Sequence, residues 1–162
     1  MAVFEEILFT DRLRLRPISQ RDARVFATLG RDPDVFRWIP EIDPPFNADA
    51  WVSELIGNPE NYLRHAVEIN RTGRVIGAIQ LNRRNNLALQ IGYWFGKSFW
   101  GQGYATETVE AVIGFLDKHT GEPIHAAVHP DNIASRYVLE NNGFVCLRRY
   151  LREMLEYRRV RP

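Results

Sequence analysis

Residues 91–118 constrain the fold of this chain more than any other stretch. The segment 89–95 is rich in branched and aromatic residues, which predicts a β-strand. A short turn containing Gly101 and Gly103 follows it. From 105 to 116 apolar residues recur at spacings of three and four, which predicts an amphipathic helix with Gly121 as its stop signal. The stretch therefore reads as strand, tight turn and helix.

This combination is suited to holding an anion. The first-turn amides of a helix have no intrahelical acceptor, and the helix dipole places partial positive charge there. Gly101 and Gly103 let the backbone approach a ligand closely, because glycine has no Cβ and tolerates positive φ. Residues 100–106 are therefore predicted to cradle a phosphate or pyrophosphate group.

Two common nucleotide-binding patterns do not fit this turn. The run 96–98, Gly-Lys-Ser, looks like the end of a triphosphate-binding loop, but that pattern needs glycine at position 91, which is Ile91. A dinucleotide fingerprint that starts at Gly101 needs Gly or Ala at position 106, where Thr106 stands.

The core Gly103-Tyr104-Ala105 resembles the acyl-CoA loop of the GNAT superfamily of N-acetyltransferases, and the run 91–106 resembles its RimJ/RimL-like branch. The segment 128–144, VHPDNIASRYVLENNGF, resembles the second CoA-proximal segment of the superfamily, and 11–18, DRLRLRPI, resembles the first strand of the branch. The resemblance implies the α/β GNAT fold, with a mixed, mostly antiparallel sheet and a central splayed parallel strand pair flanked by helices.

The resemblance also implies a reaction: direct transfer of acetyl from acetyl-CoA to an amine, without an acyl-enzyme and without a metal. The CoA pyrophosphate would lie on amides 101–106, and the pantetheine arm would lie beside residues 93–95. A backbone amide at Trp94 or Phe95 would stabilise the developing oxyanion. Ser135 would lie near the thioester sulfur, so the implied catalytic residues are Ser135 and Trp94. The implied CoA-binding residues are Tyr93, Trp94, Phe95, Trp100, Gly101, Gln102, Gly103, Tyr104, Ala105, Thr106, Asn132 and Ser135.

Two positions depart from the superfamily pattern. Leu139 stands where many members have the tyrosine that protonates the thiolate, and Tyr137 two residues earlier is expected to pack in the core. Gln90 stands where relatives often have a glutamate base, which leaves Glu68 and Glu41 as substitutes. At pH 7 an α-amine of pKa about 8 is roughly one-tenth neutral, whereas lysine is neutral in about one part in 2,500. The missing base therefore favours an α-amine or a small amine of low pKa.

The other patterns predict one domain over residues 1–162, with element order β-α-α-β-β-β-α-β-α-β-β. The strand expected at 123–129 follows a strand–helix unit, so it should lie parallel to 89–95. The aromatic segment 38–41 either packs onto the core or forms a wall of the acceptor pocket. Cys146 is expected in the core.

Two charged patterns have simple explanations. The arginines of residues 12–16 alternate with leucines, which favours a solvated strand face over a nucleic-acid patch. His125 and His129 lie four residues apart without an adjacent carboxylate or thiol, so no metal site is expected.

Composition limits the partners and the location. Lys and Arg number 21 against 20 Asp and Glu, and this net charge of +1 gives no reason to expect nucleic acid or a membrane surface as a partner. The chain has a single cysteine, no apolar run of about 20 residues and no signal-like N-terminus, so a cytoplasmic protein is expected. The expected partners are acetyl-CoA and an amine acceptor (a protein N-terminus or a small molecule), bound by a monomer or homodimer. The alternative is a CoA-binding module that has lost turnover and acts as a sensor or partner.

Overall fold

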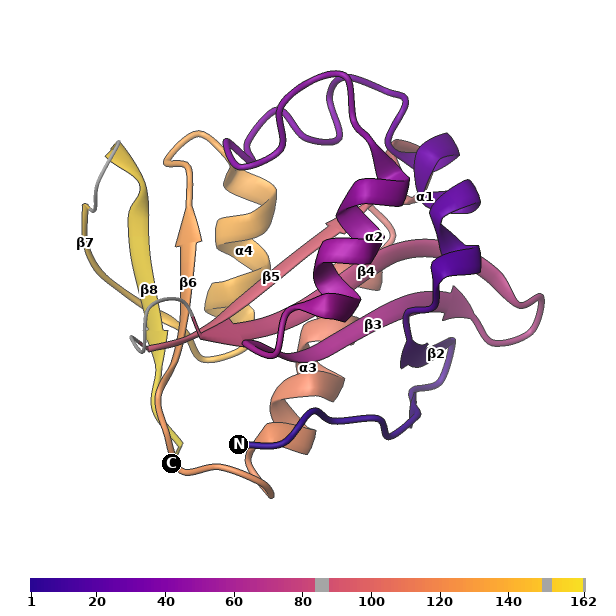
Figure 1. Ribbon diagram of the computed structural model, residues 1–162. Helices are drawn as coiled ribbons and strands as arrows, with labels where there is room; N and C mark the ends of the chain where they lie inside the picture. The colour runs from indigo at the N-terminus through magenta and orange to yellow at the C-terminus, as the bar shows by residue number, and fades with distance from the viewer. Residues whose placement is uncertain (84–87, 150–152, 162) are drawn as a thin grey trace.

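The computed structural model describes residues 1–83, 88–149 and 153–161. Within them, one sheet has the strand order β1-β2-β3-β4-β5-β6-β8-β7, with helices on both faces (Figure 1). The strands are β1 (Leu8–Phe9), β2 (Leu13–Pro17), β3 (Asn61–Ile69), β4 (Arg74–Arg83), β5 (Leu89–Phe95), β6 (Ile124–Val128), β7 (Val145–Arg149) and β8 (Leu155–Arg159). The helices are α1 (Ala23–Leu29), α2 (Ala48–Gly57), α3 (Tyr104–Leu116) and α4 (Ile133–Asn141), with 3-10 turns at Gln20–Asp22 and Lys97–Phe99.

Two hydrophobic cores hold the helices to the sheet. On one face Val109 and Leu116 of α3 and Leu139 of α4 are almost fully buried. On the other face Phe26 of α1 and Val52 of α2 are fully buried together with aromatic rings. The mixed sheet confirms the predicted GNAT arrangement, and the element order matches the prediction except for the additional short strand β1.

The parallel pairing of β5 with β6 is short. The two strands are in register at Leu89–Ile124 and Gln90–His125, and the pairing extends no further along the described residues. The other described strand pairs are antiparallel. The predicted parallel pair is thus confirmed, and β5 and β6 separate beyond Gln90.

Beyond Gln90, every second residue of β5 directs its backbone N–H and C=O groups into the gap between β5 and β6. Gly96 N donates to Ile76 O of β4 at 2.9 Å, and β4 and β5 keep one register along their length. In an antiparallel ladder, hydrogen-bonding residues alternate, so Trp94 bonds to β4 while Tyr93 and Phe95 turn their backbone groups toward β6. Trp100 Nε1 donates to Phe95 O at 2.9 Å, which fits this direction.

The helix ends show local capping. Asn47 caps α2 by accepting from Ala50 N at 3.0 Å, and Gly143 follows the end of α4 with φ of 80°. The predicted stop at Gly121 is wrong, because α3 ends at Leu116 and a hydrogen-bonded turn follows.

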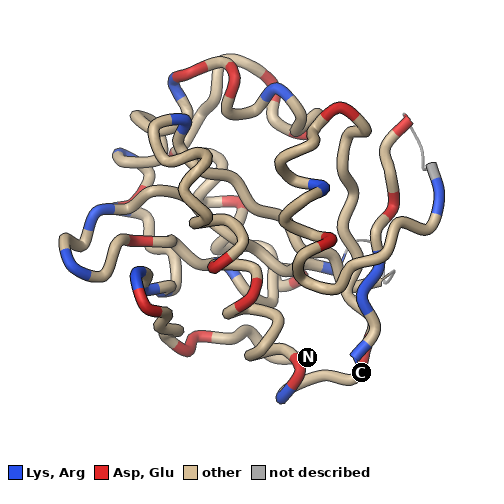
Figure 2. The backbone as a smooth tube through the Cα atoms, turned by 180° about the vertical axis from the view of Figure 1, so that it is seen from behind, with Lys and Arg blue, Asp and Glu red and all other residues tan. Residues whose placement is uncertain are grey.

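Two side chains predicted to pack in the core are exposed instead. Cys146 is an exposed free thiol on β7, the edge strand of the sheet. Tyr137 on α4 is 65% exposed. Figure 2 shows basic and acidic residues interspersed along the visible backbone.

The arginines of β2 form ion pairs, so the predicted solvated face holds only in part: the side chain of Arg14 is 37% exposed, whereas that of Arg16 is 16% exposed. Arg16 donates to Asp22 at 2.8 and 2.9 Å and to Glu68 at 3.1 Å. Arg14 donates to the other oxygen of Glu68 at 2.7 Å. Burial alone would raise the pKa of Asp22, but hydrogen bonds from Arg16 and from Ser19 N outweigh it and the pKa is lowered. This network joins β2, β3 and the start of α1.

Replacing Arg16 with Met should lower the free energy of unfolding by about 3 kcal/mol, because buried Asp22 loses its only cationic partner in the described residues. Denaturant unfolding at pH 7 measures the loss. The lowered pKa of Asp22 makes this stabilisation present above about pH 4 and lost as the pH falls. The difference from wild type should therefore narrow in acid.

The matched control is Arg24→Met on the exposed side of α1, which should change stability by less than about 0.5 kcal/mol. Equal stability of Arg16→Met and wild type at pH 7 would contradict the structural role of this network.

Candidate active site

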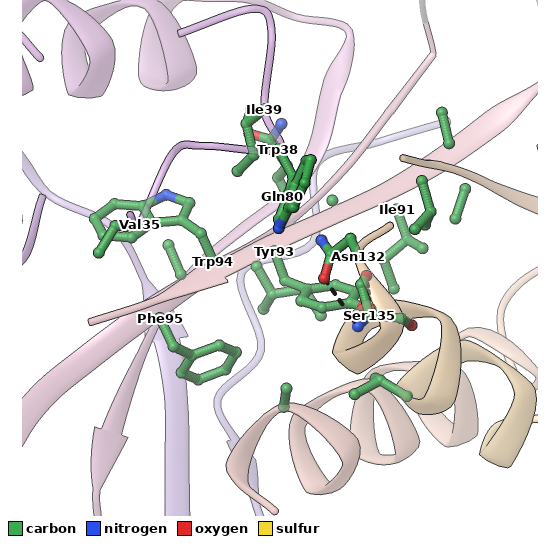
Figure 3. A pocket seen from close by; sticks show the side chains of 18 of the residues that line it. Val35, Trp38, Ile39, Gln80, Ile91, Tyr93, Trp94, Phe95, Asn132 and Ser135 are labelled. Atoms are coloured by element: carbon green, nitrogen blue, oxygen red, sulfur yellow. Dashed lines mark hydrogen bonds between the residues drawn. The ribbon is translucent and has the colours of Figure 1, made fainter. Parts of the chain in front are cut away.

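A cavity of about 1220 Å³ opens where β5 and β6 separate. The residues that line it come from β4, β5 and β6, from the start of α4, from α2 and from the loop before α2. Figure 3 shows Tyr93 and Ser135 on one side of β5 and Trp38 and Gln80 on the other. The cavity therefore passes from one face of the sheet to the other through the gap.

The predicted anion cradle forms one end of the cavity. Gly101 and Gly103 adopt φ of 71° and 80°, the left-handed conformation that glycine allows. The first helical hydrogen bond of α3 runs from Glu107 N to Gly103 O at 3.1 Å. The amides of residues 104–106 therefore precede the helical ladder and have no intrahelical acceptor.

Arg12 holds this cradle in place. Its Nη1 donates to Gln102 O at 2.9 Å, its Nε donates to Glu107 Oε2 at 2.7 Å, and its guanidinium lies 4.3 Å from the centre of the Tyr104 ring. Burial would raise the pKa of Glu107, but hydrogen bonds from Thr10 and Arg12 lower it overall. Sequence patterns did not indicate this contact, because Arg12 and Glu107 lie 95 residues apart.

The second predicted segment meets β5 through hydrogen bonds. Asn132 caps α4 by accepting from Ser135 N at 3.2 Å. The Ser135 and Tyr93 hydroxyl groups are 2.8 Å apart (Figure 3). Burial raises the pKa of Tyr93 well above its usual value, although the hydrogen bond with Ser135 acts in the opposite direction.

Amide side chains cover the face of the sheet opposite to the one on which Tyr93 and Ser135 lie. Asn61, Asn82 and Gln90 are cross-strand neighbours on β3, β4 and β5, and Gln80 lies opposite Gly92. A Cβ at Gly92 would meet Gln80 Nε2 at 3.5 Å, so the Gln80 side chain extends over β5. All five residues line the cavity, and we call Gln80, Asn82 and Gln90 the amide floor.

Among the described residues, three buried polar atoms of the cavity lining have no hydrogen-bond partner: Gln80 Oε1, Asn82 Oδ1 and Trp94 Nε1. Unpaired buried polar groups are costly, and ligand sites are a common reason for them. Sequence patterns did not indicate Gln80 or Asn82, because a polar residue within a strand is typical of a solvated face. Asn82 is nevertheless only 7% exposed.

The loop before α2 closes the cavity. Trp38 stacks on His129 with 4.4 Å between ring centres, so this loop reaches the turn between β6 and α4. Trp38, Ile39 and Glu41 also line the cavity. Segment 38–41 therefore packs against the structure and also lines the cavity, while its role as a wall of the acceptor pocket stays a prediction.

The structure separates the two candidate bases. Glu68 is 5% exposed, is held by Arg14 and Arg16, and is absent from the cavity lining, so its prediction as a base is wrong. Glu41 lines the cavity. Of the twelve residues implied to bind CoA, all but Gln102 line the cavity, and Gln102 donates to Ser98 O.

His125 has a carboxylate neighbour, contrary to expectation: its Nδ1 lies 3.0 Å from Glu156 Oε1. Over residues 1–83, 88–149 and 153–161 there is no group of three His, Cys, Asp or Glu side chains placed to hold a metal ion. In the same ranges none of the helices has the length and apolar character needed to span a membrane.

Comparisons with known proteins agree with this geometry. The chain is 33% identical over 144 residues to protein YkkB of Bacillus subtilis, covering 84% of this chain and 83% of that protein. It is 30% identical over 149 residues to an uncharacterised N-acetyltransferase, p20, of Bacillus licheniformis, covering 86% and 82%. Among solved structures, Mycobacterium smegmatis RimJ in complex with CoA-disulfide has a TM-score of 0.79 at 22% identity, covering 97% of this chain and 88% of that one.

A second solved structure is RimL, a ribosomal L7/L12 α-N-protein acetyltransferase in complex with coenzyme A. It has a TM-score of 0.77 at 19% identity, covering 96% of this chain and 97% of that one. Residues 12–145 match the family model described as the acetyltransferase (GNAT) domain. The chain therefore belongs to the GNAT acetyltransferase family.

Proposed function

We propose that this protein transfers an acetyl group from acetyl-CoA to an uncharged primary amine by direct attack on the thioester. The observation that carries the proposal is the open edge of β5, which runs beside the helix N-terminus that forms the anion cradle. A ligand with a diphosphate at one end and amide groups along its arm would satisfy both features. Acetyl-CoA has this composition.

The donor would lie on the α3 and α4 side of the gap. Its pyrophosphate would accept hydrogen bonds from amides 101–106, where Gly101 and Gly103 keep side chains away from the phosphates. Its pantetheine arm would pair with β5 in the manner of an added strand. By the alternation in β5, the Phe95 amide faces the gap and the Trp94 amide faces β4. We therefore assign the oxyanion donor to Phe95 in preference to Trp94.

The acceptor would enter over the amide floor. Gln80 and Asn82 carry unpaired buried oxygens, and an amine nitrogen is a donor that could satisfy them. The floor is uncharged, so it favours a neutral amine over an ammonium ion, which would lose its hydration. An α-amine is neutral far more often than lysine at pH 7, and the name of the structural neighbour RimL points to an α-amine as well. The acceptor class is thus a protein N-terminus or a small amine of low pKa.

Glu41, which lines the cavity, is the candidate base. We further propose that residues 1–162 form one catalytic domain and that the protein is cytoplasmic. The second candidate function is a CoA-binding module without turnover. Gln90 in the floor and Leu139, a fully buried residue of the cavity lining, favour it because neither can transfer a proton.

Turnover over a panel of amines separates the two functions. The enzyme should release free CoA from acetyl-CoA, with kcat/KM at pH 7 higher for peptide N-termini than for lysine side chains. Calorimetric binding of acetyl-CoA without thiol release from any amine would favour the module. Preference for lysine would reject the uncharged-amine assignment.

Gln90→Glu tests the uncharged-amine assignment by adding a base to the amide floor. A carboxylate in the floor can take the proton of an ammonium ion, so this variant should raise kcat/KM for high-pKa amines about tenfold or more at pH 7. Low-pKa amines, which already bind neutral, should change little. An equal effect on both classes would contradict the argument.

Gly103→Val tests the cradle. The branched side chain would stand beside the phosphates at φ of 80°, so we expect at least a hundredfold loss of CoA affinity by calorimetry. Gly73→Val is the matched control, because Gly73 has φ of 70°, open space around it and a place in the β3–β4 turn outside the cavity. It should be destabilised by similar strain yet bind CoA normally. Normal CoA binding by Gly103→Val would contradict the assignment of amides 101–106 as the pyrophosphate site.

A further inference from the structure

Tyr93 joins β5 to the first turn of α4 through Ser135. The two hydroxyl oxygens are 2.8 Å apart, and the Tyr93 hydroxyl also lies 3.4 Å from Ser135 O. Both residues line the cavity (Figure 3). The contact stands three residues beyond the last paired residue of β5, Gln90, where β6 no longer holds the strand. Tyr93 therefore fixes the position of Ser135 relative to the open edge of β5.

We propose that Tyr93 is a positioning residue for Ser135: its hydroxyl donates to Ser135 Oγ, so that the Ser135 hydroxyl donates to the departing sulfur of CoA. This inference rests on the proposed function. A serine hydroxyl has one hydrogen and commonly turns it toward a carbonyl of the preceding helical turn. A hydrogen bond accepted from Tyr93 occupies an Oγ lone pair and favours the orientation in which that hydrogen points into the cavity.

The opposite direction leaves the sulfur without a donor. If Ser135 donated to Tyr93, the hydrogen of Ser135 would be used, and the hydrogen of Tyr93 would point to Ser135 O. The chain from Tyr93 to Ser135 to sulfur gives each hydrogen an acceptor. A negative sulfur also makes the final bond charge-assisted, which is the stronger type.

The acidities of Tyr93, Ser135 and the CoA thiol determine whether this series of hydrogen bonds can transfer a proton. Burial raises the pKa of Tyr93, so its hydroxyl stays protonated across the working pH range. Alcohols are weaker acids than thiols, so Ser135 stabilises the thiolate by a hydrogen bond and keeps its proton. When the C–S bond breaks, its electron pair goes to sulfur. The attacking nitrogen loses a proton to solvent through the candidate base Glu41, and the thiolate takes one from solvent.

The pKa of the CoA thiol in its complex with the protein tests the proposed hydrogen bonds from Tyr93 to Ser135 and from Ser135 to sulfur. Thiolate formation is followed by ultraviolet absorbance while CoA, bound to the full chain, is titrated with base. We expect a bound thiol pKa below that of free CoA. Ser135→Ala and Tyr93→Phe should each raise it by about one unit, the effect of one hydrogen bond to a charged group. The double variant should match Ser135→Ala, because Tyr93 acts through Ser135.

Turnover supplies a second readout. Both single variants should lower kcat about tenfold with little change in KM for acetyl-CoA. Tyr62→Phe is the matched control: Tyr62 lies on β3 outside the cavity lining, and its hydroxyl bonds to Arg83. It should leave the thiol pKa and kcat unchanged.

The outcomes separate this inference from the proposed function. Normal CoA binding with a thiol pKa that Tyr93→Phe does not move would overturn the role of Tyr93 and leave the acetyltransferase intact. Additive shifts in the double variant would also overturn it, since Tyr93 would then act independently of Ser135. Failure of the wild-type chain to bind CoA would overturn both.

Discussion

The early end of the β5–β6 pairing is the constraint on which the site depends. A parallel pair normally satisfies the facing backbone groups of both strands, and buried backbone groups without partners are rare. Here the pairing stops at Gln90 and His125, and β5 continues to Phe95 with alternate amides directed into the gap. The pantetheine arm of CoA carries amide groups of its own, so it is suited to fill a place that a strand would otherwise occupy.

Distant contacts hold the gap open and place groups around it. The two cores fix α3 and α4 on one face of the sheet and α1 and α2 on the other. Arg12 ties β2 to the cradle at the start of α3, and Tyr93 ties β5 to the start of α4. The N-terminus of α3, which is the proposed phosphate site, and that of α4, which carries Ser135, are therefore both fixed relative to the same strand. Chemistry at the thioester requires this shared reference, because small displacements of reacting groups are costly.

Features encoded locally could be predicted from the sequence. The strand, turn and helix of residues 91–118 follow from apolar periodicity, and the positive φ of Gly101 and Gly103 follows from the residue type. The cap at Asn47 and the left-handed Gly143 are also local effects. The resemblance to the GNAT family added the position of Ser135 beside the gap.

Features that depend on pairing between distant segments could not be predicted in the same way. Glu68 looked available as a base until β2 placed Arg14 and Arg16 beside it. Cys146 looked buried because its strand is apolar, yet that strand lies at the sheet edge. Gln80 and Asn82 become candidate site residues only because the strand register places them with Gln90 on the cavity floor.

Amide hydrogen exchange on β5 tests the central claim most directly. In the free protein, the amides of Tyr93 and Phe95 should exchange much faster than that of Trp94, which bonds to β4. Addition of CoA should protect one or both of them and the amides of residues 104–106. Equal protection of all three β5 amides in the free protein, or no change at Tyr93 and Phe95 when CoA binds, would contradict the account.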